Sequence, residues 1–207
     1  NYQDDISLNY YLLASKDGIT IGKRYFKHEN NKEDYPFSPS GHNLYDNNSK
    51  LYYCRDFDNI VYQIHEDSVV PRFRINLPNP LPASMIEERP NEMSLLRSGY
   101  SLGITDIYEY GGLLFFRFVK DGYIWSCLYN VEESKQVYCA KRIKFLDSSL
   151  IDTIDGIYKD CFYSILTPEY LDYAFSENPL EDYPDLFKTY DVEGDNPVIA
   201  FYRAVVR

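Results

Sequence analysis

The chain has 207 residues, and 21 Lys and Arg side chains against 32 Asp and Glu give it a formal net charge of −11. An acidic chain repels a phosphate backbone, so nucleic acid is excluded as the expected partner, and a hydrophobic content of 44% argues against a disordered chain. No apolar run reaches the roughly 18 residues of a membrane helix, and a chain of this length can bury a core without a metal, so we expect no transmembrane segment and no cofactor.

Tyrosine is the unusual feature of the composition. The chain contains 22 Tyr and 12 Phe but one Trp. Planar rings pack well on a pleated, half-buried surface, which makes Tyr and Phe strand formers. Tyrosine also suits positions where the ring is buried and the hydroxyl stays in water. The composition therefore predicts an all-β fold.

Strand-like segments alternate with short polar turns in the first part of the chain. They are 8–15, 19–26, 50–55, 59–64 and 70–77. Lys16-Asp17-Gly18 and Asp56-Phe57-Asp58 separate the paired segments and predict two hairpins. Pro71 places the fifth segment at an edge or at the start of a strand, because proline cannot donate a hydrogen bond to a sheet.

Two short helices are predicted next, over 82–88 and 91–97. Pro90 separates them because proline interrupts a helix, and Gly99 ends the second one. We place them in a connection between strands.

The region 104–141 has the clearest pattern in the chain. It contains four strand-like segments, 104–110, 113–119, 123–129 and 136–141. Gly111-Gly112 supplies the positive φ angles of a tight hairpin, and Lys120-Asp121-Gly122 makes the next turn. Four strands joined by tight turns in about forty residues match one blade of a β-propeller.

The last part of the chain mixes strands with one helix. Residues 156–166 and 197–206 are strand-like. Between them, Thr167-Pro168-Glu169 predicts the start of a helix that reaches about Phe175, because Thr can cap, Pro fits the first turn and Glu favours the positive end. An acidic connector is expected at 176–185.

The four cysteines, at positions 54, 127, 139 and 161, lack the spacing of a zinc site. If the hairpin across 130–135 is centred on Glu133, Cys127 and Cys139 lie opposite each other and can form a disulfide in an oxidising compartment. Two buried thiols are the favoured alternative, because free cysteine often serves as a small apolar residue. No metal-ligand pattern and no catalytic motif is found, so neither a metal site nor a catalytic residue is predicted.

Aromatic and arginine side chains in the strand segments are the candidate ligand-binding residues. They are Tyr53, Arg55, Arg72, Arg74 and Trp125. An exposed ring beside arginine can stack on a sugar or grip an acidic partner, and propellers commonly bind at the mouth of the ring. The favoured alternative is structural, since alternating aromatics pack between blades and arginine covers them with its aliphatic stem.

Three segments of the chain resemble one protein family. They are LYYCRDFDNIVYQIHEDSVVPRFRINL at 51–77, LIDTIDGIYKDCFYSILTPEYL at 150–171 and EGDNPVIAFYRAVVR at 193–207. Their order and spacing are similar to the C-terminal portion of the TolB-like six-bladed β-propeller lipoproteins of Bacteroidetes. The resemblance implies four-stranded antiparallel blades in a partial ring of about three to four blades, with short helices in connecting loops and a single domain over 1–207.

The same resemblance implies a function and a location. We expect a non-catalytic binding or scaffold module for a glycan or a protein, outside the cytoplasm in the periplasm or at the cell surface, with a lipid anchor in the full-length precursor. The alternative is a propeller-type hydrolase or lyase acting on glycan or peptide. Because a partial ring leaves blade edges exposed, we also expect a homodimer through those edges.

Overall fold

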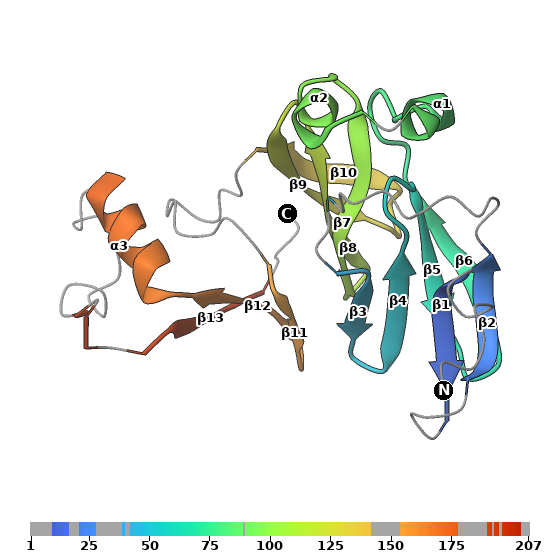
Figure 1. Ribbon diagram of the computed structural model, residues 1–207. Coiled ribbons are helices and arrows are strands. Elements are labelled where there is room, and N and C mark those ends of the chain that lie inside the picture. Colours follow the sequence, from blue (N-terminus) through green and yellow to red (C-terminus); the bar gives the residue numbers. More distant parts are fainter. Residues whose placement is uncertain are drawn as a thin grey trace, which may run out of the picture.

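The protein, seen here as a computed structural model, is built from antiparallel sheets (Figure 1). The structure describes residues 10–16, 21–27, 39, 42–88, 90–141, 154–177, 190–191, 193–194 and 196–203. Strands dominate this part of the chain, and its helices are short. No helix among these residues is long and apolar enough to cross a membrane. The all-β prediction is confirmed.

The first four-stranded sheet runs in the order β3-β4-β5-β6. Its strands are β3 (Leu44–Asn47), β4 (Lys50–Cys54), β5 (Ile60–Ile64) and β6 (Val69–Arg74). Sequence reasoning predicted the last three and missed β3. The reason is the β3–β4 turn, where Asn48 and Ser49 adopt φ angles of 47° and 73° without a glycine.

The second four-stranded sheet has the order β10-β9-β8-β7 and matches the predicted blade. Its strands are β7 (Ser101–Tyr110), β8 (Leu113–Lys120), β9 (Tyr123–Asn130) and β10 (Lys135–Ala140). All residues of β7 from Ser101 to Tyr108 are buried, on both faces of the strand. This strand therefore lies between other parts of the protein and not at its surface.

A hairpin and a three-stranded sheet complete the strands. The hairpin pairs β1 (Tyr10–Ser15) with β2 (Ile21–Lys27), and the sheet has the order β11-β12-β13, with β11 (Gly156–Tyr158), β12 (Cys161–Leu166) and β13 (Val198–Tyr202). The predicted strand over 156–166 is two strands, because Lys159 adopts a φ of 55° and turns the chain. Two four-stranded sheets, this third sheet and the hairpin agree with a partial ring of three to four blades.

The helices lie where the sequence predicts them. They are α1 (Ala83–Glu87), α2 (Glu92–Leu96) and α3 (Pro168–Glu177). The side chain of Asn91 accepts a hydrogen bond from the backbone N–H of Ser94 at 2.9 Å and caps α2. Residues 176–177 of the expected acidic connector belong to α3, and 178–185 lie outside the described residues.

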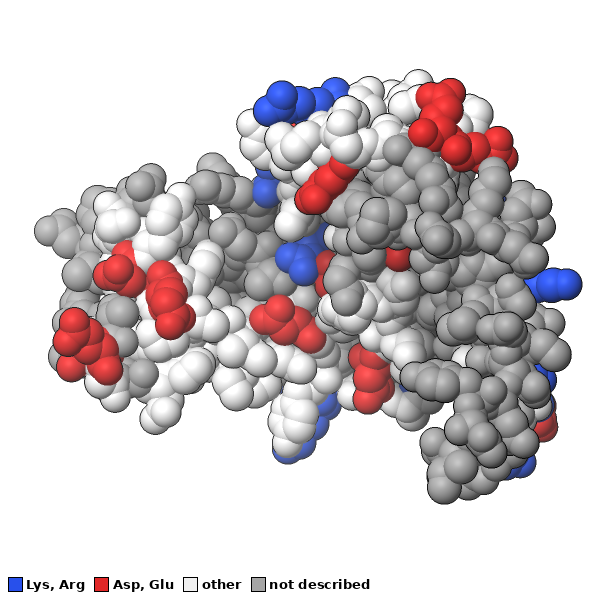
Figure 2. Space-filling model, in the orientation of Figure 1, with Lys and Arg blue, Asp and Glu red and all other residues white. Residues whose placement is uncertain are grey.

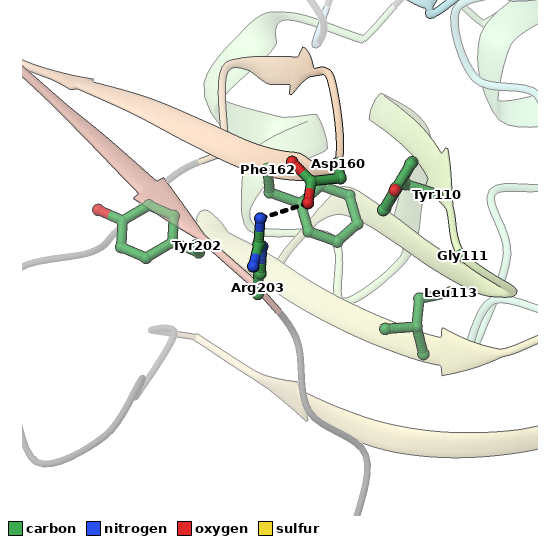
Figure 3. Close-up of a pocket in the computed structure, with 7 residues that line it drawn as sticks. All are labelled: Tyr110, Gly111, Leu113, Asp160, Phe162, Tyr202 and Arg203. Carbon is green, nitrogen blue, oxygen red and sulfur yellow. Dashed lines mark hydrogen bonds and ion pairs between the residues drawn. The ribbon is translucent and has the colours of Figure 1, made fainter.

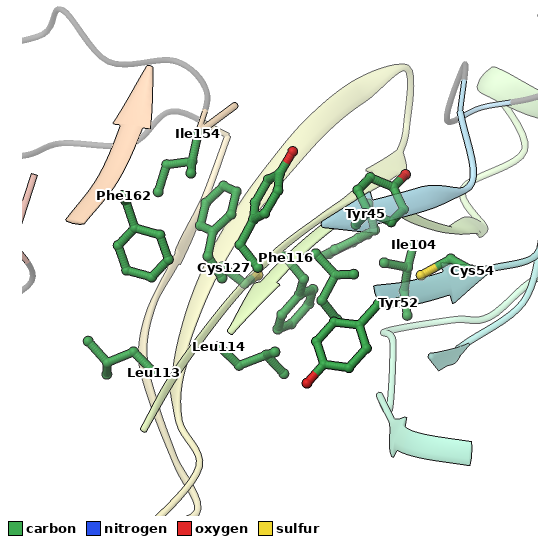
Figure 4. Packing of buried hydrophobic residues seen from close by; sticks show 14 of the residues in the cluster. Tyr45, Tyr52, Cys54, Ile104, Leu113, Leu114, Phe116, Cys127, Ile154 and Phe162 are labelled. Carbon is green, nitrogen blue, oxygen red and sulfur yellow. The ribbon is translucent and has the colours of Figure 1, made fainter. Parts of the chain in front are cut away.

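The core forms where the first strands of the three larger sheets, β3, β7 and β11, contact one another. Figure 4 shows Tyr45 and Tyr52 of the first sheet beside Ile104 and Phe116 of the second. Tyr45 is 1% exposed and its hydroxyl donates to the backbone carbonyl of Thr105 on β7. Tyrosines therefore pack between sheets and hydrogen-bond across the junction, as the composition indicated.

The outer hairpin of the second sheet carries a disulfide. Cys127 of β9 and Cys139 of β10 are register partners and are joined through their Sγ atoms, whereas Cys54 and Cys161 are free. The register shifts between Gln136 and Tyr138, and this shift brings Cys139 opposite Cys127. The predicted juxtaposition is confirmed, and the favoured alternative of two separate thiols is wrong.

Candidate functional site

A pocket of about 290 Å³ lies between the second and third sheets (Figure 3). The hairpin turn after β7 forms one wall, and the β11–β12 turn with the end of β13 forms the other. The seven lining residues are Tyr110, Gly111, Leu113, Asp160, Phe162, Tyr202 and Arg203. The pocket therefore joins segments that are far apart in the sequence.

Apolar and aromatic side chains form the inner wall of the pocket. Leu113 and Phe162 are both buried, and the Tyr110 and Phe162 rings meet edge to face with centroids 6.4 Å apart. In Figure 3 the ring of Tyr202 lies on the opposite side of Arg203 from these two rings. Burial raises the pKa of Tyr202 to about 12.

The mouth of the pocket is charged and open to solvent. Arg203 forms an ion pair with Asp160, and both side chains are more than half exposed (Figure 3). A hydrogen bond with Cys161 and the charge of Asp160 raise the pKa of Arg203. Exposed pairs of this kind contribute little to stability, and solvent reaches both side chains.

The pocket combines an apolar wall with charged groups at its mouth. An aromatic and aliphatic wall can pack against the apolar face of a sugar ring or a peptide side chain. The fixed charges of Asp160 and Arg203 can orient polar groups of such a ligand. Among the seven lining residues no nucleophile lies beside a base, and nowhere in the described part of the chain do three His, Cys, Asp or Glu side chains gather as metal ligands.

The structure places two of the sequence-predicted site residues, Tyr53 and Arg55, in one cluster. Phe26 of β2 stacks on the Tyr53 ring at 5.4 Å, and the Arg55 guanidinium lies 5.3 Å from the centroid of the same phenylalanine. Arg55 also pairs with Asp58 at 2.6 Å. The hairpin β1–β2 therefore covers Tyr53, which is 3% exposed and takes part in packing between the hairpin and the sheet.

Arg72 lies in another cluster, around Glu109 of β7. Its guanidinium donates to a Glu109 carboxylate oxygen at 3.0 Å, and Lys50 Nζ and the Tyr52 hydroxyl donate to the other oxygen. Burial raises the pKa of Tyr52, and its hydrogen bond to Glu109 raises it further. Arg72 therefore links β6 to β7, since its charge is already matched by a carboxylate.

Trp125 lies in the second sheet, apart from the other predicted residues. It stacks on its register partner Phe118 with centroids 6.2 Å apart. Lys141 Nζ lies 5.8 Å from the Trp125 ring and 3.5 Å from that of Tyr123, which is exposed. Trp125 is half-buried, so part of its ring faces solvent. Arg74, the remaining candidate, ends β6.

Sequence reasoning missed the residues of the pocket. Tyr110 was assigned only to a strand, and Asp160 was placed inside a continuous strand over 156–166. Gly111-Gly112 was a usable signal, because it places Tyr110 at the end of a hairpin. The turn at Lys159-Asp160 has no glycine or proline and gave no such signal.

One face of the molecule carries charges of both signs. Figure 2 shows acidic side chains spread over the face drawn, with a few basic groups between them. A surface whose charges all have one sign produces a single-sign field, which attracts a polyelectrolyte of opposite charge over a long distance. The described residues on this face carry mixed charge and produce no such single-sign field.

Comparison with known proteins identifies the family. The model of family DUF5128, described as a 6-bladed beta-propeller, matches residues 1–149. The fold is similar to the crystal structure of a Bacteroides fragilis NCTC 9343 protein described as a candidate exported protein, with a TM-score of 0.68 and 15% identity. That match covers 96% of this chain and 58% of the other, so this chain spans less than two thirds of that protein's length. No match was found among curated proteins.

The family match agrees with the sheets. Residues 1–149 include the hairpin β1–β2 and both four-stranded sheets, and the similarity to the Bacteroides fragilis structure extends over the third sheet as well. The predicted fold of a partial β-propeller is thus confirmed. The chain belongs to the DUF5128 family of 6-bladed beta-propellers.

Proposed function

We propose that the protein is a non-catalytic binding module that recognises a glycan or a peptide segment of a protein at the pocket between the second and third sheets. The pocket is the observation that carries the proposal. It combines the buried Phe162 and Leu113 side chains with the solvent-exposed Asp160 and Arg203. This mixture of an apolar wall and a few charged groups is typical of sites for small ligands.

We propose further that the protein works outside the cytoplasm. The Cys127–Cys139 disulfide supports this location, because disulfides persist in oxidising compartments. The resemblance to TolB-like lipoproteins of Bacteroidetes and the candidate export of the similar Bacteroides fragilis protein point the same way. A lipid anchor in the full-length precursor and a homodimer through blade edges, both expected from that resemblance, stay part of this proposal.

Glycan arrays and peptide arrays test the ligand class, and substitutions at the mouth of the pocket test the site. Arg203→Gln and Asp160→Asn remove charges from exposed side chains and leave the buried wall intact. We expect each substitution to weaken binding of an array hit about tenfold, the effect of losing one charged hydrogen bond. Isothermal calorimetry with that hit gives the dissociation constants.

Control variants distinguish ligand binding at this pocket from ligand binding at the other candidate residues. Lys23→Gln breaks an exposed ion pair with Asp67 far from the pocket and should leave the dissociation constant unchanged. Trp125→Phe tests the aromatic site predicted on β9. Loss of binding in Trp125→Phe with no change in Arg203→Gln would move the site to β9, and turnover of any polysaccharide or peptide by the wild-type protein would favour the hydrolase or lyase alternative.

A further inference from the structure

Two aromatic side chains of β9 lie on one face of the second sheet. Tyr123 is 54% exposed and Trp125 is half-buried. They are two residues apart on the strand and therefore point to the same face. The Nζ atom of Lys141, which directly follows β10, lies 3.5 Å from the centroid of the Tyr123 ring and 5.8 Å from that of Trp125. One ammonium group is therefore shared by two rings, on the side of the sheet away from β7.

This aromatic surface is not at an end of the row of sheets. The second sheet has a neighbour on each side, because β7 contacts β3 and β11. Phe118, the register partner of Trp125, shares its face with Phe116, which lies beside Tyr52 of the first sheet (Figure 4). The face is therefore covered by the first sheet near β7 and opens to solvent at Tyr123. Both neighbouring sheets are part of the described structure.

The aromatic surface is also separate from the pocket between the second and third sheets. Leu113 lines that pocket, and Phe118 pairs with Trp125. These two residues of β8 are an odd number of positions apart and therefore point to opposite faces of the sheet. A ligand held by Tyr123 and Trp125 would thus bind on the other side of the sheet from a ligand in the pocket.

The residues of this surface match the chemistry of an acidic sugar. The flat rings of Tyr123 and Trp125 can pack against the C–H groups of a sugar ring. Lys120, the register partner of Tyr123, pairs with Asp121 at 2.7 Å, so these two charges cancel. Lys141 adds a positive charge, and its contacts with the described residues are to aromatic rings and not to a carboxylate. The charge beside the rings is therefore complementary to a carboxylate.

The position of Lys141 lets it exchange one partner for another. An exposed ammonium gains less from a ring than from a charge-assisted hydrogen bond to a carboxylate. Lys141 is exposed and has a long, flexible side chain. Its Nζ atom can therefore leave the Tyr123 ring for the carboxylate of a ligand, and this movement uncovers the ring for the sugar.

We propose that Tyr123, Trp125 and Lys141 form a second binding site, which takes a sugar residue that carries a carboxylate, such as a uronic acid. The two rings stack on the sugar, and Lys141 Nζ donates a hydrogen bond to the carboxylate. The proposal does not depend on the ligand of the pocket, because the two sites lie on opposite faces of the second sheet.

Titrations with acidic oligosaccharides are the first test, and the emission of Trp125, the chain's single tryptophan, reports on this site directly. The probes are trimers of galacturonic, mannuronic and glucuronic acid, together with their methyl esters, which keep the rings and lose the charges. We expect a saturable change in emission with at least one acid, and about tenfold weaker binding of its ester. Equal binding of acid and ester, or no saturable change in emission or heat with any of the three acids, would overturn the proposal.

Substitutions with matched controls test the residues of the site. Lys141→Gln should weaken binding of the acid about tenfold and leave binding of the ester unchanged, since the ester has no carboxylate. Lys135→Gln, at the other end of β10, is its control, because Lys135 is also exposed. Tyr123→Ser should weaken binding of acid and ester alike, and Tyr173→Ser on α3, where the tyrosine is 51% exposed, should change neither.

Tetramethylammonium distinguishes a site for acidic sugars from a site for cations. A cation would compete with Lys141 for the two rings, so Lys141→Gln would strengthen its binding, whereas an acidic sugar loses affinity in the same variant. Tighter binding of tetramethylammonium than of every acidic trimer, or unchanged binding of the acid in Lys141→Gln, would contradict the proposal. Far-ultraviolet circular dichroism checks that Lys141→Gln and Tyr123→Ser are folded, which the exposure of both side chains leads us to expect.

Discussion

Gly103 shows how one residue fixes the contact between two sheets. It adopts a φ of 97° in β7, and a Cβ atom on it would lie 2.8 Å from Cα of Phe57. The backbone N–H of the next residue, Ile104, donates to the carbonyl of Asp58 at 3.2 Å. β7 can therefore approach the β4–β5 turn closely only because position 103 has no side chain.

We predict that Gly103→Ala destabilises the protein by at least about 2 kcal/mol, because the methyl group meets backbone that cannot move aside and the φ angle is unfavourable for alanine. Gly111→Ala is the matched control. Gly111 has a φ of 59°, but nothing lies within 4 Å of its Cβ position, so only the backbone cost of about 1 kcal/mol applies. Urea unfolding gives both values, and equal losses would show that the close contact at Gly103 has no cost.

At the scale of elements, the sequence predicted most hairpins and all three helices. Gly111-Gly112 and Lys120-Asp121-Gly122 mark two turns of the second sheet, because glycine tolerates positive φ angles. The structure makes the same kind of turn at Asn48-Ser49 and at Lys159 without glycine, and there the strand boundaries were missed. Residue type therefore predicts a turn only where the residue in the turn is one, such as glycine, that favours the positive φ angle of that turn.

The candidate site could not be predicted in the same way. The pocket forms where the turn after Tyr110 meets the turn at Asp160, and local patterns carry no information on that contact. Tyr53, Arg55 and Arg72 were chosen by residue type, and each makes a contact with Phe26, Asp58 or Glu109 that the sequence pattern could not foresee. A ligand-binding role for these three residues and Trp125 stays a prediction.

The disulfide gives a prediction for the β9–β10 hairpin. Its cysteines are 12 residues apart, and closing a loop of this length in the unfolded chain stabilises a protein by about 3 kcal/mol in the chain-entropy model. We expect Cys139→Ser to lower the free energy of unfolding by about 2–3 kcal/mol. Reductant should remove the difference from the wild type, and Cys161→Ser, at a free thiol, serves as control.

A thiol titration of the denatured protein without reductant checks the same disulfide directly. Cys54 and Cys161 should react, and Cys127 and Cys139 should not. Four reactive thiols would show that the hairpin is held by packing and backbone hydrogen bonds alone.

At the scale of the whole molecule, Glu109 links the first two sheets by charge. It lies on β7 and accepts hydrogen bonds from Tyr52, Lys50 and Arg72 of the first sheet. Burial alone would raise the pKa of Glu109, but these hydrogen bonds and the charge of Arg72 outweigh burial and hold it below the usual 4.5. The ionised carboxylate therefore stabilises the junction between the sheets.

The single domain expected over 1–207 stays a prediction.

The lowered pKa sets the direction of a pH dependence. The stabilisation from Glu109 is fully present above pH 4.5 and is lost as the pH falls through the lower pKa of the folded state. We expect Glu109→Gln to cost about 1–2 kcal/mol at neutral pH, and its difference from the wild type to shrink below pH 4.5. Urea midpoints measured over a pH series test this.

Asp67→Asn is the control for that series. Asp67 pairs with Lys23 at the surface, where its side chain is 81% exposed, so its removal should change stability by about 0.5 kcal/mol or less. A difference between Glu109→Gln and wild type that stays constant into acid would contradict the assigned role of the carboxylate.

The position of the single tryptophan determines what optical experiments on this protein can detect. Trp125 lies in the second sheet, stacked on Phe118 and two residues from the disulfide-bonded Cys127. Its emission therefore reports on β8 and β9, and detachment of β11–β13 would leave that signal largely unchanged. The 22 tyrosines are spread along the chain, so their absorbance averages over all the sheets. Unfolding curves from the two chromophores that fail to coincide would thus reveal a third sheet that separates before the rest.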